Sequence, residues 1–388
     1  MIFDRTYFDR GLERMGTRSE KWDTCRREHG ADVLPMWVAD MDFPSPPACA
    51  EAILKRAAHP TYCYTEICPD DFEAVAAFWK RRHGLTVDPG KIVMLPCVVT
   101  GLKTAIRALT VPGDGVIILS PVYGPFRFSV EATGRRLMDV PLVKDEANRY
   151  YMDLAGVESA LKDGGKLIML CNPHNPVGRC WTREELTALL ALLDRYDAYL
   201  VSDEIHADFV YEKGAFTPAL ALREDRVLSL CAASKTFNLA GLQQASALCP
   251  DDGIREKYTR ALEEAGVTSG NIFALEATRA AYTDGDAWLD GLIAYLDENR
   301  RYLTEWIGRE LPRVKVSPLE ATYLAWLDCT AYTGSCEEIA GRCEKAGLVM
   351  TGGDFFGKGG DGFMRLNFAC PRSTLEEGLQ RLKTALEG

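Results

Sequence analysis

Short apolar runs alternate with amphipathic segments along most of this chain, and this alternation limits the fold more than any other feature. Apolar residues at three- and four-residue spacing predict helices at 47–58, 70–82, 101–109 and 182–195. Runs typical of buried strands lie at 92–95, 116–119, 166–171, 199–202, 227–231 and 245–249. Strands and helices that alternate in this way form βαβ units. We therefore expect an α/β fold with a mostly parallel sheet flanked by helices.

The pattern changes near residue 285, which predicts a second, smaller domain. A chain of 388 residues is too long for one ordinary hydrophobic core. We expect an irregular N-terminal segment at 1–46 that packs with the small domain, a large domain at 47–284 and a small α+β domain at 285–388. In this last part, helices are predicted at 287–309, 336–346 and 373–386, and strands at 314–317, 322–327 and 362–368.

Charge and cysteine content exclude several classes of protein. The net charge is −11 and no long basic run occurs, which argues against nucleic acids and acidic membranes as main partners. The first residues do not resemble a signal peptide, and no run approaches the ~20 apolar residues that span a bilayer. The 13 cysteines include several in apolar runs and no pair with zinc-site spacing. We expect no metal and a reducing, cytoplasmic compartment.

Three polar residues follow predicted strands in a way that suggests a ligand site. Asn175 follows the strand at 166–171, Asp203 follows 199–202, and Lys235 follows 227–231. Ligands bind at the carboxyl ends of parallel strands, so these side chains are expected to meet there. Each has a structural alternative: a solvated or ion-paired lysine, a helix-capping aspartate and a turn-forming asparagine. Together they suit a pyridinium cofactor held by the lysine as a Schiff base.

Pyridoxal phosphate needs an imine-forming lysine, an anion at the ring nitrogen, a donor to the phenolate oxygen, an aromatic ring and a phosphate site. Lys235, Asp203 and Asn175 suit the first three tasks, and ion pairing is expected to depress the pKa of Asp203. Tyr123 follows another strand and can stack on the ring, although it could also be a core aromatic residue. The backbone around Val99 and Thr100 opens a helix after a strand, so its N–H groups can hold phosphate.

These residues, in this order, resemble the fold-type I pyridoxal phosphate enzymes, the aminotransferase class I/II superfamily. Segments 34–43, 171–179, 203–206, 234–241 and 363–372 are similar to those of the MalY/PatB-type cystathionine β-lyases, also called cysteine C–S lyases. Among them are Asp-Glu-Ile-His at 203–206 and Ser-Lys-Thr-Phe-Asn at 234–238. The resemblance runs from about residue 10 to the C-terminus. It implies that the domain at 47–284 binds the cofactor.

The resemblance also implies further roles for single residues. Arg365 would bind the substrate α-carboxylate, a task that suits the planar guanidinium, and Val38 and Ala39 would lie on the substrate side. Ser234 would add a hydroxyl to the phosphate site. Tyr64 would reach the phosphate of a neighbouring subunit, also as part of the catalytic apparatus, which implies a homodimer with a shared active site.

The chain departs from the superfamily pattern at three positions. Ala232 stands where many members have a hydroxyl residue, and Gln243 stands where many have an arginine. His206 stands where aminotransferases usually have tyrosine, and it is expected to contact the phenolate oxygen. Three of the candidate site residues have a structural alternative. His206 could be a buried histidine whose hydrogen bonds are satisfied within the protein. Tyr64 could pack at an interface, and Arg365 could pair with a carboxylate of the protein. His174 receives no role.

The reaction implied is β-elimination, in which Lys235 acts as general base with a lowered pKa. An amino-acid substrate such as cystathionine or a cysteine S-conjugate would yield a thiol, pyruvate and ammonia. An aminotransferase on the same scaffold is the alternative, because the same site can reprotonate the cofactor instead. A third hypothesis is that the chain is a regulatory protein with secondary lyase activity.

Overall fold

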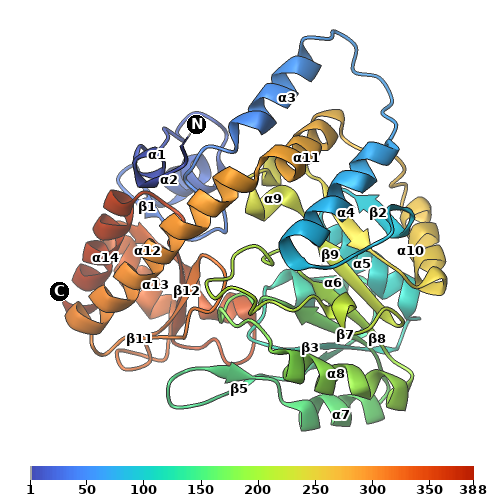
Figure 1. Ribbon diagram of the computed structural model, residues 1–388. Helices are drawn as coiled ribbons and strands as arrows, with labels where there is room; N and C mark the ends of the chain where they lie inside the picture. Colours follow the sequence, from blue (N-terminus) through green and yellow to red (C-terminus); the bar gives the residue numbers. More distant parts are fainter. Residues whose placement is uncertain (1) are drawn as a thin grey trace.

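Seven strands form the central sheet of the computed structural model, which describes residues 2–388. Their order is β2–β10–β9–β8–β7–β3–β4 (Figure 1). The neighbours from β9 to β4 pair in parallel, and only β10 runs antiparallel to both of its neighbours. The mostly parallel sheet predicted from the sequence is confirmed. The strands are β2 (Ile92–Leu95), β3 (Gly115–Ile118), β4 (Arg136–Asp139), β7 (Gly165–Cys171), β8 (Tyr199–Asp203), β9 (Val227–Cys231) and β10 (Ala245–Leu248).

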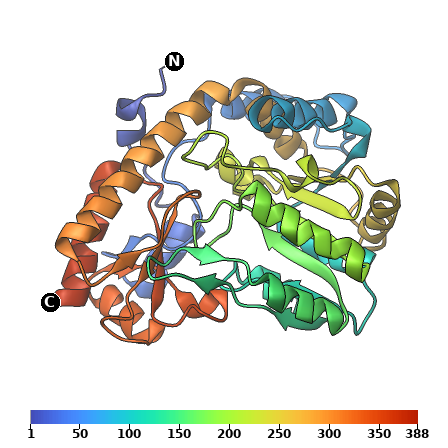
Figure 2. The same ribbon diagram turned by 60° about the horizontal axis from the view of Figure 1, so that its bottom comes forward.

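Helices cover both faces of this sheet, as Figure 2 shows. The strands are apolar on both sides because each face is buried, which explains why they read as continuous apolar runs. Residues alternate between two cores: Ile168 and Leu170 of β7 face one, and Leu167 and Met169 face the other. The helices of this part are α3 (Pro47–Ala57), α4 (Pro69–His83), α5 (Val98–Leu109), α6 (Pro125–Ala132), α7 (Leu154–Lys162), α8 (Arg183–Tyr196), α9 (Ala233–Thr236), α10 (Asp252–Glu264) and α11 (Ile272–Asp284).

A smaller antiparallel sheet lies in the C-terminal part, beside the long helix α12 (Asp286–Glu310) (Figure 2). Its strands follow the order β11 (Lys315–Val316), β12 (Leu324–Asp328), β15 (Phe363–Asn367) and β14 (Thr351–Gly352). Helices α13 (Cys336–Lys345) and α14 (Arg372–Glu387) complete this part. Two short strand pairs remain: β1 (Leu34–Pro35) with β13 (Leu348–Val349), and β5 (Val143–Lys144) with β6 (Tyr150–Tyr151).

The N-terminal segment contains more regular structure than expected. It forms α1 (Arg5–Asp9), a π-helical turn at Glu20–Thr24 and α2 (Cys25–His29), so the prediction of an irregular segment is wrong in part. These helices are too short for periodicity to reveal them. Strand β1 pairs with β13 in the C-terminal part. This pairing supports a segment that packs with the small domain, and we propose the three-part division of the chain on that basis.

The connection between α3 and α4 stands away from the rest of the molecule (Figure 1). It has no regular structure from Pro60 to Cys68, and most of its side chains are exposed. Tyr64 is fully exposed at 100%. We call residues 58–68 the exposed arm. Across residues 2–388, no helix has the length and apolar character that crossing a membrane requires.

Candidate active site

Four polar or aromatic side chains meet at one edge of the central sheet because the strands that carry them are parallel. Tyr123 lies in the loop after β3, Asn175 follows β7, Asp203 ends β8, and Lys235 lies on α9 directly after β9. The carboxyl ends of parallel strands share an edge, so residues far apart in sequence become neighbours.

A cavity of about 480 Å³ lies at this edge, between the central sheet and the C-terminal part. Ten of the residues singled out from the sequence line it: Val38, Ala39, Val99, Tyr123, Asn175, Asp203, His206, Ser234, Lys235 and Arg365. Two others do not. Tyr64 lies on the exposed arm, and the Thr100 hydroxyl contacts the Cys97 sulfur at 3.3 Å instead.

The amine of Lys235 is held by the N-terminal segment. Its Nζ donates to the carbonyl oxygen of Ala39 at 2.7 Å, and the Tyr323 hydroxyl donates to the same oxygen at 3.2 Å. Burial lowers the pKa of Lys235, and the nearby positive charge of Arg365 acts in the same direction. A lysine with a depressed pKa has more of the neutral amine that can act as a nucleophile or base.

Asp203 is a buried carboxylate without a cationic partner. Its Oδ1 accepts a hydrogen bond from the Ile205 N–H at 3.1 Å, and no ion pair of Asp203 occurs within residues 2–388. Burial raises its pKa to about 7, despite the opposing effects of that hydrogen bond and of Lys235. The prediction of a lowered pKa for Asp203 is therefore wrong for the protein without a cofactor. A lowered pKa requires a cation beside the carboxylate.

Arg365 of β15 is a buried cation in the same cavity, with only 3% of its surface exposed. Its Nη1 donates to Asn175 Oδ1 at 3.0 Å and its Nη2 to the Trp37 carbonyl oxygen at 2.9 Å. Its Nε has no partner among the described residues, and burial lowers its pKa to about 10. Neither contact neutralises the charge, so the structural alternative of a carboxylate partner is not found within residues 2–388.

His206 is 2% exposed and neutral in this setting. Burial, followed by the positive charges of Lys235 and Arg365, lowers its pKa to about 3. Its Nδ1 has no hydrogen-bond partner in the described part of the chain. A satisfied buried histidine therefore does not describe it. A neutral imidazole can donate one hydrogen bond into the cavity and accept another.

The N-terminus of α5 provides a site for an anion. Cys97 precedes the helix with an extended backbone, and the first amides, from Val98 to Thr100, have no intrahelical acceptor. Val98 and Val99 line the cavity. Amides that point out of a helix N-terminus bind phosphate groups well. Thr100 would contribute through its backbone, since its hydroxyl faces Cys97.

His174, which received no role from the sequence, links two of the loops that line the cavity. Its Nε2 lies 2.9 Å from the Pro121 carbonyl oxygen, and the Tyr123 N–H donates to the Asn175 carbonyl at 3.1 Å. Since a carbonyl can only accept, Nε2 must carry the proton. Burial lowers the pKa of His174 to about 4, so the ring stays neutral.

Five further cavity residues were given no role from the sequence, and all but Trp37 come from segments without a chemical motif. They are Glu20, Trp37, Gln244, Thr351 and Phe355. Trp37 lies within segment 34–43, so the resemblance of that segment was the one available signal. The others come from the π-helical turn (Glu20), the segment after η4 (Ala240–Leu242), strand β14 and the 3-10 helix η5 (Gly353–Phe356), none of which the sequence pattern places beside the sheet.

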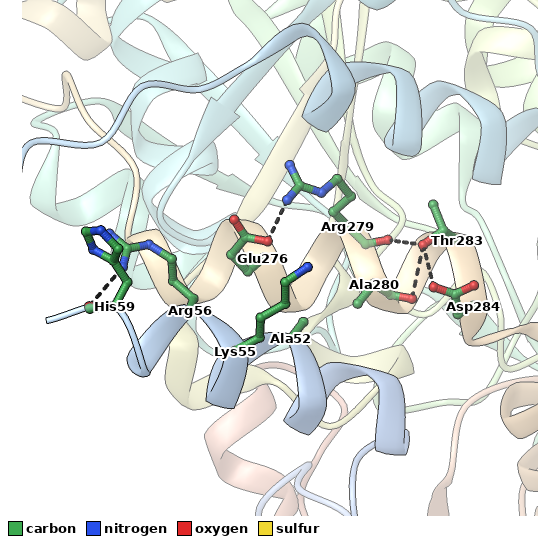
Figure 3. A pocket seen from close by; sticks show the side chains of 9 residues that line it. All are labelled: Ala52, Lys55, Arg56, His59, Glu276, Arg279, Ala280, Thr283 and Asp284. Atoms are coloured by element: carbon green, nitrogen blue, oxygen red, sulfur yellow. Dashed lines mark hydrogen bonds and ion pairs between the residues drawn. The ribbon is translucent and has the colours of Figure 1, made fainter. Parts of the chain in front are cut away.

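A second hollow, of about 770 Å³, lies between α3 and α11 (Figure 3). Lys55 and Arg56 line one side, and Glu276 and Arg279 line the other. Arg279 is already paired with Glu276 at 2.5 Å and with Asp71 at 3.2 Å. The hollow lacks a buried, unpaired charge, so the cavity around Lys235 remains the candidate active site.

Comparison with known proteins confirms the resemblance inferred from the motifs. The sequence model described as aminotransferase class I and II matches residues 31–382. The chain is 42% identical to cystathionine beta-lyase PatB of Bacillus subtilis, over 98% of this chain and 99% of that protein. It is 33% identical to protein MalY of Escherichia coli, over 98% of each.

A solved structure agrees with these sequence relatives. The PLP-bound C-S lyase of Staphylococcus hominis superposes with a TM-score of 0.91 at 30% identity and covers 98% of both chains. The predicted fold-type I architecture is thereby confirmed. This chain belongs to the aminotransferase class I and II family.

Proposed function

We propose that this protein is a pyridoxal phosphate-dependent carbon–sulfur β-lyase. It would cleave cysteine S-conjugates such as L-cystathionine to a thiol, pyruvate and ammonia. The single observation that carries the proposal is the cavity in which buried Lys235, Asp203 and Arg365 converge. The names of the PatB relative and of the C-S lyase structure support the same reaction class.

The residues of the cavity fit pyridoxal phosphate. Asp203 is a buried carboxylate that lacks a cation, which suits a protonated ring nitrogen. Asn175 Oδ1 accepts a hydrogen bond from Arg365, which leaves the Asn175 Nδ2 as the end that can donate to the phenolate oxygen. Tyr123 lines the cavity and can stack on the ring, and the amides of α5 suit the phosphate. Ser234 can add its hydroxyl there.

The cofactor supplies an electron-accepting ring that stabilises negative charge at the substrate α-carbon. The chain's own residues do the rest. Arg365 binds the α-carboxylate, and its Nε is free to donate. Lys235, with its lowered pKa, takes the α-proton as general base. Val38 and Ala39 border the substrate, and the Ala39 carbonyl orients the lysine amine.

The β-substituent decides the outcome of proton removal. A thiolate is a good leaving group, so the β-carbon–sulfur bond breaks and the thiolate takes up a proton. Water then releases the remaining fragment as pyruvate and ammonia. His206 and Asn175 would hold the phenolate oxygen of the cofactor, since a neutral histidine and an amide can both donate a hydrogen bond.

Incubation with L-cystathionine and no keto acid tests this reaction. The proposal predicts pyruvate, ammonia and homocysteine in equal amounts. Product formation that depends strictly on added keto acid, with no thiol release, would favour the aminotransferase alternative and contradict the lyase proposal.

We also propose that the protein acts as a homodimer. Tyr64 is fully exposed on the arm at 58–68. Among residues 2–388, the Lys and Arg side chains that line the cavity are Lys235 and Arg365, to which the scheme assigns the imine and the α-carboxylate, so neither is left for the phosphate end near Val99 and Ser234. A hydroxyl from a second copy would complete that end. Sedimentation of the holoenzyme at twice the mass of one chain supports this, and a monomer that retains full activity contradicts it.

We propose a cytoplasmic location as well. All 13 cysteines are free thiols, and most of them are buried. Disulfide-free chains with this many cysteines are typical of reducing compartments. Fractionation of the source cells tests this.

A further inference from the structure

Four side chains that carry formal charge line the candidate active site: Glu20, Asp203, Lys235 and Arg365. The proposed function uses three of them. In that scheme Asp203 would pair with the ring nitrogen, Lys235 would hold the cofactor and move the α-proton, and Arg365 would bind the α-carboxylate. Glu20 has no task in that scheme.

The carboxylate of Glu20 is free of protein partners. No hydrogen bond or ion pair found in residues 2–388 involves it, whereas Ser19 and Lys21 on either side are both bound to other residues. Glu20 is exposed at the cavity mouth, yet its charge acts on the interior. Burial lowers the pKa of Lys235, and Asp40, Asp203 and Glu20 oppose that effect.

The backbone at Glu20 is fixed by its neighbours. Lys21 is 1% exposed, and its Nζ pairs with Asp42 Oδ2 at 2.7 Å. The Trp22 indole donates to Asp42 Oδ1 at 2.7 Å, and the Trp37 indole donates to the Lys21 carbonyl at 3.3 Å. Trp37 itself lines the cavity. The backbone of Glu20 is therefore anchored beside the cavity by a buried network, and its side chain extends from that fixed position.

Much of the cavity lining is apolar or aromatic. Trp37, Tyr123 and Phe355 line the same cavity as Glu20, and the Tyr123 and Phe355 ring centroids lie 6.1 Å apart. A thioether chain that leaves the β-carbon and passes these rings would end near an unpaired negative charge. A group of opposite charge at that end gains attraction, and a carboxylate there is repelled.

We propose that Glu20 determines specificity by favouring cysteine S-conjugates that carry an ammonium group on the departing thiol. This inference rests on the proposed lyase function and names its substrate class. Because Glu20 is exposed, the gain is that of a surface ion pair, about two- to fivefold in kcat/KM. Salt screens such a pair, so the preference should shrink as ionic strength rises.

Three S-substituted cysteines of similar size provide the test: S-(2-aminoethyl)-, S-(2-hydroxyethyl)- and S-(carboxymethyl)-L-cysteine. Pyruvate release by the holoenzyme gives kcat/KM for each. The expected order is ammonium, then neutral, then carboxylate. Glu20→Gln should lower kcat/KM for the aminoethyl compound about two- to fivefold and leave the hydroxyethyl compound unchanged. Glu20→Lys should reverse the order of the charged pair.

Glu28→Gln is the matched control, because Glu28 is also an exposed acid of the N-terminal segment but does not line the cavity. It should keep the wild-type order. If all three compounds are cleaved at rates that Glu20→Gln does not alter, the specificity role is wrong and the lyase function stands. If L-cystathionine releases pyruvate but none of the three compounds does, the specificity role alone is wrong; if L-cystathionine is not cleaved either, both are wrong.

Discussion

Arg365 Nη1 lies 3.0 Å from Asn175 Oδ1, which joins a strand of the C-terminal part to the loop after β7. This contact sets the orientation of the Asn175 amide, because the oxygen faces the cation and the Nδ2 donor faces the cavity. Because the amide oxygen is neutral, the positive charge of the Arg365 guanidinium still lacks a counter-anion. The two residues thus present one free donor to the cofactor and one uncompensated positive charge to the substrate.

Arg365→Lys should impair substrate binding. Lysine keeps the positive charge but loses the planar fork that matches a carboxylate. A hydrogen bond to a charged group contributes about 1.5–3 kcal/mol, so kcat/KM should fall about 10- to 160-fold, mainly through KM. Steady-state kinetics on L-cystathionine measures this, with cofactor absorbance as a check on the site. An unchanged KM would exclude Arg365 as the carboxylate ligand.

Asp203→Asn should reduce activity far more than Glu204→Gln. Both acids are buried neighbours, but only Asp203 lines the cavity. Glu204 Oε1 instead accepts from the Ser202 hydroxyl and the Ala219 N–H, each at 2.9 Å. Loss of one preorganised electrostatic contact costs about 100-fold or more in kcat, which we expect for Asp203→Asn alone. Comparable losses in the two variants would point to a general effect on folding.

Glu204 should make the folded state sensitive to pH. Burial raises its pKa from 4.5 to about 7, so the folded protein holds this proton more tightly than the unfolded chain. Below pH 4.5, Glu204 contributes up to about 3 kcal/mol to the free energy of unfolding. This contribution is lost as the pH rises to about 7.

Glu204→Gln cannot ionise, so its melting temperature should fall less than that of the wild type between pH 5 and 8. Thermal melts of both holoenzymes measure this difference. Asp203 and its cofactor are present in both proteins, so the difference between their curves reports on Glu204. Parallel curves for the two proteins would show that Glu204 keeps an ordinary pKa.

Tyr64→Phe should weaken cofactor binding. If the Tyr64 hydroxyl donates to the phosphate bound in a second copy, its loss removes one hydrogen bond and raises the cofactor Kd about 2- to 12-fold. Tyr62→Phe is the control, since the Tyr62 hydroxyl already donates to the Ala57 carbonyl of its own chain at 3.0 Å. Titration of each apoprotein with pyridoxal phosphate gives the Kd. Equal Kd values in all three proteins would place Tyr64 outside the site.

The strand-end residues could be predicted from the sequence because topology alone brings them together. Lys235, Asp203 and Asn175 each follow an apolar run, and parallel strands place such ends at one edge. Most predicted elements occur within two residues of their expected bounds. Helix α5 begins three residues earlier than expected, at Val98, because valines at its N-terminus weaken the helical signal.

The remaining elements and cavity residues depend on tertiary contacts, which a local sequence pattern does not encode. Strands β4, β5 and β6 and helices α6, α7, α10 and α11 were not predicted. The reversed direction of β10 was not predicted either, since a buried strand looks the same in both orientations. Glu20 reaches the cavity through the Lys21–Asp42 pair, which joins positions 21 residues apart. The raised pKa of Asp203 reflects a burial that only the packed structure reveals.

Every role assigned to this cavity depends on Lys235 carrying the cofactor. Reduction of the holoenzyme with sodium borohydride fixes an imine permanently, and peptide mass spectrometry then locates it. We predict a phosphopyridoxyl adduct on the peptide that contains Lys235, and none in Lys235→Ala treated in the same way. An adduct on a different lysine of the wild type, or one that persists in Lys235→Ala, would contradict the assignment of this active site.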